Sequence, residues 1–130
     1  MLALASSMGS VSEITGDISL RSRPFEVITG ALADLGCSVS RTEGGGLVVS
    51  GPAVPGKVAL DLSKGSQPLS SLLIAAPSMG VNIEVEIQGE PVSQRYLELT
   101  YAICKLTGSE NEFSGHNIRI APWDVTLPEE

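Results

Sequence analysis

The sequence predicts an α+β fold built from a repeated βαβαββ unit, of which about one and a half copies are present. The first observation is a recurrence, because Met8-Gly9 returns 71 positions later as Met79-Gly80. The second is that runs alternating apolar and polar residues are interleaved with runs whose apolar residues have helical spacing. The same offset relates further pairs: Ser22 and Ser93, Phe25 and Tyr96, Ala31 and Ala102, Leu35 and Leu106.

The recurrence divides the chain into two unequal copies. Residues 1–51 are expected to form an incomplete first unit and residues 57–122 a complete second unit. Residues 52–56 are a connector and residues 123–130 a tail without a core-forming pattern. A strand-like run precedes the first helix of the second copy, whereas Met1 falls inside the matching helix of the first. We therefore expect a piece of a larger protein.

In the first copy, residues 2–8 are predicted to end a helix at Gly9, and residues 11–15 to form a strand. Pro24 is expected to open the next helix, because proline lacks the N–H that would be unpaired there. That helix carries an apolar stripe and ends at Gly36. Two strands, 37–41 and 47–50, follow around a glycine-rich turn. The stripe comprises Phe25, Ile28, Leu32 and Leu35.

In the second copy, the predicted order is strand, helix, strand, helix, strand, strand. Residues 57–62 and 82–88 alternate as half-buried strands do. The helices are expected over residues 67–76 and 93–106, and the last strands over residues 112–114 and 117–121. The second helix ends before Gly108, and its apolar stripe is assigned to the core: Leu99, Ile103 and Leu106.

Composition limits the function. The chain has 130 residues, 42% hydrophobic and 18% charged, which suits a folded domain with a core. Its net charge of −7 disfavours nucleic-acid binding, which needs many cations on phosphates, but leaves room for one small anionic ligand. No apolar run approaches the ~20 residues of a membrane helix, so neither a nucleic acid nor a membrane is an expected partner.

The cysteines indicate a reducing environment. Cys37 and Cys104 lie in apolar patterns, which predicts two buried free thiols and a cytoplasmic location. The single histidine, His116, offers no second imidazole, so we expect no metal site. No secretory leader pattern begins the sequence.

Outside the predicted core, three polar segments each connect a strand to a helix, and we call them corners. They are Arg21-Ser22-Arg23-Pro24, Ser63-Lys64-Gly65-Ser66-Gln67 and Ser93-Gln94-Arg95-Tyr96. Helix starts collect unpaired N–H groups and attract anions. Each corner is also consistent with an ordinary structural role, namely a basic surface turn or a serine cap, with Tyr96 in the core. No catalytic triad, phosphate loop or carboxylate pair is present.

The same corners resemble segments of the enolpyruvyl transferases. Thr15-Gly16-Asp17 with Leu20-Arg21-Ser22-Arg23-Pro24 is similar to the family's strand–Arg-Pro–helix segment, and Gly65-Ser66-Gln67 to its Ser-Ser-Gln helix start. Gly89-Glu90-Pro91-Val92-Ser93-Gln94-Arg95-Tyr96 resembles its Val-Ser-Lys-Pro-Tyr segment. The match runs over residues 2–121 and favours the shikimate branch.

This resemblance implies the family fold, an inside-out α/β barrel of repeated units, of which the chain covers part of one domain. It implies transfer of the carboxyvinyl group of phosphoenolpyruvate to the 5-hydroxyl of shikimate 3-phosphate, in aromatic amino acid biosynthesis, without a cofactor. Ser66, Gln67, Ser93 and Tyr96 would hold shikimate 3-phosphate, while Arg23 and Gln67 would hold phosphoenolpyruvate. No catalytic residue is expected here, and the remainder of the enzyme would be the partner.

Two departures from the family pattern stand in these segments. Gly65 replaces the usual first serine and keeps only its backbone N–H, and Gln94-Arg95 replaces Lys-Pro. Because the resemblance covers only part of an enzyme, we expect the isolated chain to be inactive. The alternatives are a stand-alone, non-catalytic module that reuses the fold, another enolpyruvyl transferase, or a relative of the RNA 3′-phosphate cyclases.

Overall fold

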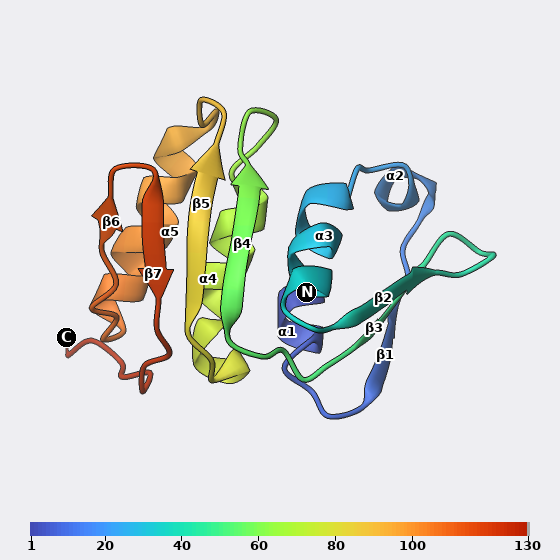
Figure 1. Ribbon diagram of the computed structural model, residues 1–130, viewed down its shortest axis with the longest axis horizontal. Helices are drawn as coiled ribbons and strands as arrows, with labels where there is room; N and C mark the ends of the chain where they lie inside the picture. The colour runs from blue at the N-terminus through green and yellow to red at the C-terminus, as the bar shows by residue number, and fades with distance from the viewer. Residues whose placement is uncertain (130) are drawn as a thin grey trace.

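A computed structural model describes residues 1–129. It contains two sheets with helices beside them (Figure 1), so the predicted α+β class is confirmed. The first sheet has the order β1-β3-β2, and the second β4-β5-β7-β6. Once β4 is set aside, the second order, β5-β7-β6, has the same pattern as the first, with antiparallel neighbours throughout.

The first part begins with α1 (Leu2–Ala5) and β1 (Val11–Ile14). The predicted helix over residues 2–8 is therefore too long, because the residues after Ala5 continue only as turns. A short helix that the sequence analysis missed, α2 (Ile18–Arg21), follows. Its N-cap Asp17 accepts a hydrogen bond from the Leu20 backbone N–H at 2.9 Å, which explains why the chain turns there.

The helix α3 (Glu26–Asp34) begins two residues after the predicted start at Pro24, because the Phe25 carbonyl is the first to accept a helical bond, from Thr29. Three residues of its predicted apolar stripe, Ile28, Leu32 and Leu35, are buried, and the fourth, Phe25, is partly buried against the core. Gly36 ends the helix with φ of 84°, and the Cys37 N–H bonds back to the Leu32 carbonyl at 2.9 Å, as in a Schellman motif.

A hairpin and an extended connection complete the first part. Strands β2 (Ser38–Arg41) and β3 (Leu47–Ser50) pair antiparallel across the glycine-rich turn, in which Gly45 has φ of 82°. The chain then crosses to the second part through a cis Gly51-Pro52 peptide bond. The predicted glycine-rich turn between β2 and β3 is confirmed.

The second part begins with β4 (Gly56–Asp61), α4 (Gln67–Met79) and β5 (Ile83–Gln88). Because β4 and β5 are parallel, α4 forms the crossover between them. The helix runs beyond the predicted end at residue 76 to a left-handed C-cap at Gly80. Its buried residues are Leu69, Leu72, Leu73, Ala75, Ala76 and Met79.

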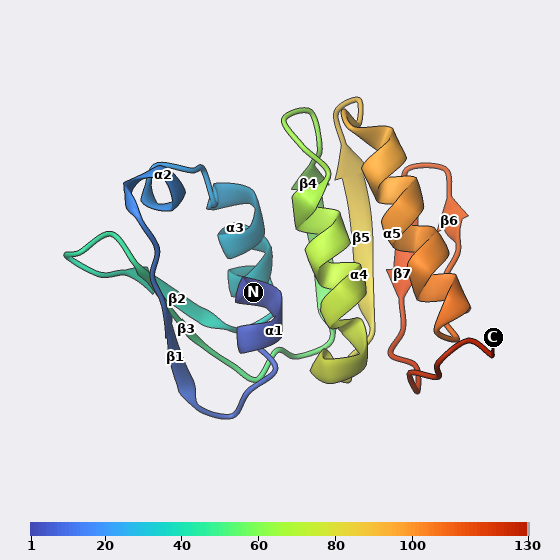
Figure 2. The ribbon, with the colours of Figure 1, turned by 180° about the vertical axis from the view of Figure 1, so that it is seen from behind.

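The chain continues through α5 (Gln94–Leu106), β6 (Phe113–Ser114) and β7 (Asn117–Ile120). Helices α4 and α5 cover one face of the second sheet (Figure 2). On its other face, Glu84 pairs with Lys57 at 3.0 Å and with Arg119 at 3.5 Å, and Lys57 lowers the pKa of Glu84. The second sheet thus has one apolar face and one charged face.

The predicted core face of α5 is wrong. Leu97 and Cys104 are buried, whereas the predicted stripe residues Leu99, Ile103 and Leu106 are 57%, 52% and 64% exposed. The side of α5 that carries Leu97 and Cys104 therefore packs on the sheet, and the predicted apolar stripe lies on the surface. Ile74 of α4 is exposed as well.

The predicted tail also differs from expectation, because it docks on α5. Trp123 is half-buried against the core, and its indole Nε1–H donates to Thr107 Oγ1 at 3.2 Å. The Thr126 N–H donates to the Thr107 carbonyl at 3.0 Å. Only Glu130, the last residue of the tail, lies outside the described residues.

The two parts share one cluster of buried side chains, which includes Leu32 of α3, Leu60 of β4 and Leu73 of α4. Contacts of α3 with β4 and of α1 with α4 join them. Cys37 and Cys104 are free and buried, as predicted, and burial raises the pKa of both thiols. Among residues 1–129, no helix is both long enough and apolar enough to cross a membrane.

Candidate functional site

The three predicted corners lie at the same end of the molecule, where β4 and β5 finish and where α3, α4 and α5 begin (Figures 1 and 2). The parallel pairing of β4 with β5 explains part of this, because parallel strands end at the same edge of a sheet. The corners are the α2–α3 connection, the β4–α4 loop (residues 62–66) and the β5–α5 loop (residues 89–93).

Two backbone hydrogen bonds join the β4–α4 loop to the end of β5 and to the β5–α5 loop. The Leu62 N–H donates to the Gln88 carbonyl at 3.1 Å, and the Val92 N–H donates to the Leu62 carbonyl at 3.2 Å. Further along, the Thr100 hydroxyl of α5 lies 3.2 Å from the Ser70 hydroxyl of α4. The structure therefore places the predicted residues of α4 and α5 on adjacent helix starts.

At the start of α4, Ser66 is only 2% exposed, and its side chain does not cap the helix. The alternative structural role, a cap by the serine side chain, is not observed, because Ser66 has φ −91° and ψ −7° rather than the extended backbone that directs a cap hydroxyl toward the helix. Among the described residues, the N–H groups of Ser66 and Gln67 have no backbone acceptor. Gln67 is exposed, and its side-chain oxygen lies over Gly65.

At the start of α5, Ser93 is exposed and has φ 57° and ψ 36°, the left-handed conformation. Among the described residues it is the one residue other than glycine with a positive φ. Its side chain makes no cap bond either. Tyr96 is 71% exposed, so the interpretation of this ring as a core aromatic is wrong.

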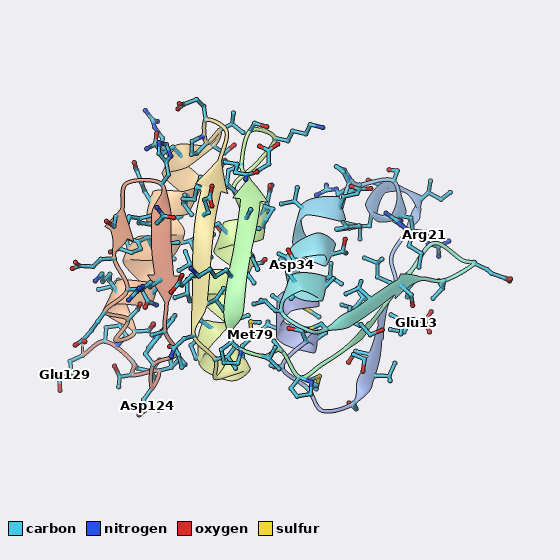
Figure 3. All side chains as sticks on the ribbon, in the orientation of Figure 1. Glu13, Arg21, Asp34, Met79, Asp124 and Glu129 are labelled. Carbon is cyan, nitrogen blue, oxygen red and sulfur yellow. The ribbon has the colours of Figure 1, made fainter. Side chains whose placement is uncertain are left out.

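The α2–α3 corner presents two exposed arginines, which differ in their contacts. Arg21 contacts two turns beside the first sheet, because its Nε–H donates to the Gly16 carbonyl and its aliphatic part lies over Gly45 in the β2–β3 turn (Figure 3). Arg23 is exposed and uses its backbone N–H to bond the Leu20 carbonyl. Among residues 1–129, no hydrogen bond joins Arg23 to the other two corners.

The cations of the protein divide into two groups of equal size. Four of the eight lysines and arginines form ion pairs with carboxylates: Arg41, Lys57, Lys105 and Arg119. The other four lie in the three corners, and among the described residues none of them has a carboxylate oxygen within 4.0 Å: Arg21, Arg23, Lys64 and Arg95. This end therefore offers unpaired positive charge in an acidic protein.

A surface hollow of about 520 Å³ lies next to the β5–α5 loop, lined by Glu86, Ile87, Gly89, Glu90, His116 and Asn117. Two carboxylates make it unsuited to an anion, and none of the predicted substrate contacts lines it. Among residues 1–129, no group of three or more potential ligands is placed to hold a metal ion.

One residue near the loops, Asp61, was not identified from the sequence. Its carboxylate accepts the Ser63 N–H at 2.9 Å, and Gly89 lies against both residues. Hydrogen bonds from Ser63 hold the pKa of Asp61 below its ordinary value. No sequence pattern marks Asp61, because the approach of Gly89 to its carboxylate depends on the pairing of two distant strands, β4 and β5.

Comparisons with known proteins identify the family to which the chain belongs. Residues 1–129 match the family model of EPSP synthase (3-phosphoshikimate 1-carboxyvinyltransferase). The chain is 35% identical over 120 residues to the 3-phosphoshikimate 1-carboxyvinyltransferase of Thermococcus kodakarensis, covering 92% of this chain and 29% of that protein. Over 100 residues it is 39% identical to that of Methanothrix thermoacetophila, covering 75% and 24%.

Two solved structures share the fold. EPSP synthase from Acinetobacter baumannii superposes with a TM-score of 0.67 at 24% identity, covering 97% of this chain and 29% of that one. The enolpyruvyl transferase NikO from Streptomyces tendae gives 0.69 at 15% identity, covering 96% and 30%. The chain spans less than a third of the length of the curated relatives described above. The resemblance inferred from the sequence is confirmed, and the chain belongs to the EPSP synthase family.

Proposed function

We propose that the chain forms part of the substrate platform of a 3-phosphoshikimate 1-carboxyvinyltransferase. The enzyme would transfer the carboxyvinyl group of phosphoenolpyruvate to the 5-hydroxyl of shikimate 3-phosphate, as a cytoplasmic step of aromatic amino acid biosynthesis. The observation that carries this proposal is the distribution of charge. The chain is a family member, and within residues 1–129 the four cations that lack a carboxylate within 4.0 Å all lie in the three corners that the family motifs mark.

Shikimate 3-phosphate would bind across the starts of α4 and α5. The unpaired N–H groups of Ser66 and Gln67 and the backbone of Gly65 suit an anion, because a helix start carries partial positive charge. The exposed Ser93 hydroxyl would donate to the same ligand, and the exposed Tyr96 ring would lie against its ring. Two adjacent helix starts thus present donors and one aromatic surface to a single phosphorylated ring.

Phosphoenolpyruvate would bind beside it, between Arg23 and Gln67. The planar guanidinium of Arg23 matches a carboxylate or a phosphate through two parallel hydrogen bonds. The chain's contribution to the reaction would then be to bind and orient two anions, which converts a bimolecular step into an effectively unimolecular one. We assign no proton transfer to its residues. His116 lines the hollow that contains Glu86 and Glu90, and none of the proposed substrate contacts lines that hollow.

The remainder of the enzyme would be the partner of this chain. The exposed apolar stripe of α5, with Ile74 of α4, supports this proposal, because removing apolar side chains of that size from water is favourable.

We also propose that residues 1–51 and 57–122 are an incomplete and a complete copy of one unit, joined by residues 52–56. The shared strand order supports the repeat. Residues 123–130 would then be a tail that follows the second copy.

The test is an NMR titration of the chain with shikimate 3-phosphate. We expect the backbone amides of residues 65–67 and 93–96 to shift together and to saturate with one affinity. Ser93→Ala should weaken the response, since a hydrogen bond to a charged group contributes about 1.5–3 kcal/mol. The matched control is Ser114→Ala, which removes an exposed serine of β6. Shifts confined to other surfaces would contradict the proposed function.

A further inference from the structure

The carboxylate of Asp61 lies where the two helix-start loops meet. Asp61 is the last residue of β4 and pairs in register with Gln88, the last residue of β5. Its Oδ1 accepts the backbone N–H of Ser63 at 2.9 Å and so fixes the first turn of the β4–α4 loop. That loop leads within a few residues to Ser66 and Gln67.

The β5–α5 loop approaches the same carboxylate so closely that only glycine fits. Gly89 has φ of 72°, a conformation that favours glycine. A Cβ on Gly89 would lie 2.8 Å from Asp61 Oδ1 and 3.2 Å from Ser63 Cβ. Gly89 begins the loop that ends at Ser93, and the Val92 N–H of that loop bonds the Leu62 carbonyl. Asp61 therefore contacts both loops at once.

The ionisation of Asp61 fits this role. Hydrogen bonds from the Ser63 hydroxyl and N–H lower the pKa of Asp61, and the nearby Lys64 ammonium lowers it further. At neutral pH the carboxylate is charged and acts only as an acceptor. It therefore draws N–H and O–H groups toward itself and does not compete with them as a donor.

We propose that Asp61 is a positioning residue, which holds the β4–α4 and β5–α5 loops in the relative arrangement that brings Ser66, Gln67 and Ser93 to one ligand. Asp61 does not touch the ligand. It acts through Ser63 on one side and through the packing of Gly89 on the other. This inference rests on the proposed function for the identity of the ligand, whereas the part that Asp61 plays in joining the loops, beside the backbone hydrogen bonds of Leu62, rests on its own contacts with Ser63 and Gly89.

The first arm of the test uses the unliganded chain. Asp61→Ala should move the backbone amide shifts of Gly89, Val92 and Ser93, which belong to the other loop, as well as those near the substitution. Asp61→Asn keeps an acceptor oxygen and should leave the shifts of that loop close to those of the unsubstituted chain. The control is Glu86→Ala, which removes an exposed carboxylate from the next strand. Changes confined to residues 61–64 would overturn the proposal.

The second arm measures the affinity for shikimate 3-phosphate. Asp61→Ala should weaken binding roughly tenfold, which corresponds to about 1.4 kcal/mol. Asp61→Asn should rescue binding, and equal losses in both variants would overturn positioning through the acceptor. Since Asp61 is exposed, the melting temperature should stay within a few degrees in all variants, whereas a purely structural role would lower it. An unsubstituted chain that fails to bind would contradict the proposed function, while the first arm would still decide whether Asp61 joins the loops.

Discussion

At the scale of single residues, the backbone conformation determines whether Ser66 and Ser93 can cap their helices. The sequence suggests that Ser66 and Ser93 serve as helix caps, but neither has the extended backbone of a side-chain cap. Ser93 in particular holds a left-handed conformation, which costs a residue with a Cβ about 1–2 kcal/mol. Such outliers persist where the surrounding structure holds them, and they cluster at functional sites. The hydroxyls of both serines are therefore left without a capping role.

Ser93→Gly should separate stability from binding. Glycine adopts φ of 57° without strain, so the variant should be more stable by roughly 0.5–1 kcal/mol, after the larger entropy of the unfolded chain is included. Its melting temperature should rise by about 2–4 °C. Affinity for shikimate 3-phosphate should nevertheless fall, because the hydroxyl is gone. Calorimetry and titration on the same sample measure both quantities, and a loss of both would mean that Ser93 is structural.

At the scale of elements, α5 shows that helical spacing identifies a stripe but not what covers it. Leu99, Ile103 and Leu106 have the spacing of a core face, yet all three are exposed. The second sheet instead buries Leu97 and Cys104, and α4 occupies the space on one side of α5. The tail adds a further contact at the end of the helix, through Thr107. An apolar stripe on a helix can therefore belong to a surface that a partner covers and not to the core of the chain.

Two leucines of α5 provide a direct test of its orientation. Leu97→Ala should lower the free energy of unfolding by about 2–5 kcal/mol, because it leaves a cavity at a side chain that is 7% exposed. Leu99→Ala is the matched control and should change it by no more than about 0.5 kcal/mol in the isolated chain. Urea denaturation followed by circular dichroism gives both values. A larger cost for Leu99 than for Leu97 would contradict the orientation described here.

At the scale of the whole molecule, packing and charge act on different faces. One shared core joins the two parts, while ion pairs between Lys57, Glu84 and Arg119 occupy the outer face of the second sheet. Exposed pairs of this kind contribute little stability, but they neutralise cations that an anion would otherwise meet. The remaining positive charge is therefore concentrated at the corner end, where the helices begin.

The isolated chain should not turn over substrate. It spans less than a third of the curated relatives, and we assign it only binding contacts. A coupled assay of phosphate release with phosphoenolpyruvate and shikimate 3-phosphate should stay at background. The informative variant is Arg23→Ala, because turnover above background that this substitution abolishes would show that the chain is catalytically complete. Background rates together with the expected titration shifts would support a binding platform.

Much of the local structure followed from the sequence because it depends on short-range physics. The alternation over residues 57–62 and 82–88 gave β4 and β5 nearly at their bounds, and Gly36 ended α3 as predicted. The α2 helix was missed because its stability comes from an Asp17 cap and not from an apolar pattern. The family resemblance marked residues for a role at the site, whereas no local pattern marked Asp61.

The sequence by itself determined the α+β class, the order of the elements except α2, the family and the residues at the three corners. Only the tertiary structure decided which side of α5 is buried, that Trp123 docks on Thr107, and that Leu62 ties two corners together. The physical reason is the range of the interactions. Periodicity and turn chemistry act within a few residues, whereas burial and the meeting of loops depend on which distant segments reach the same place.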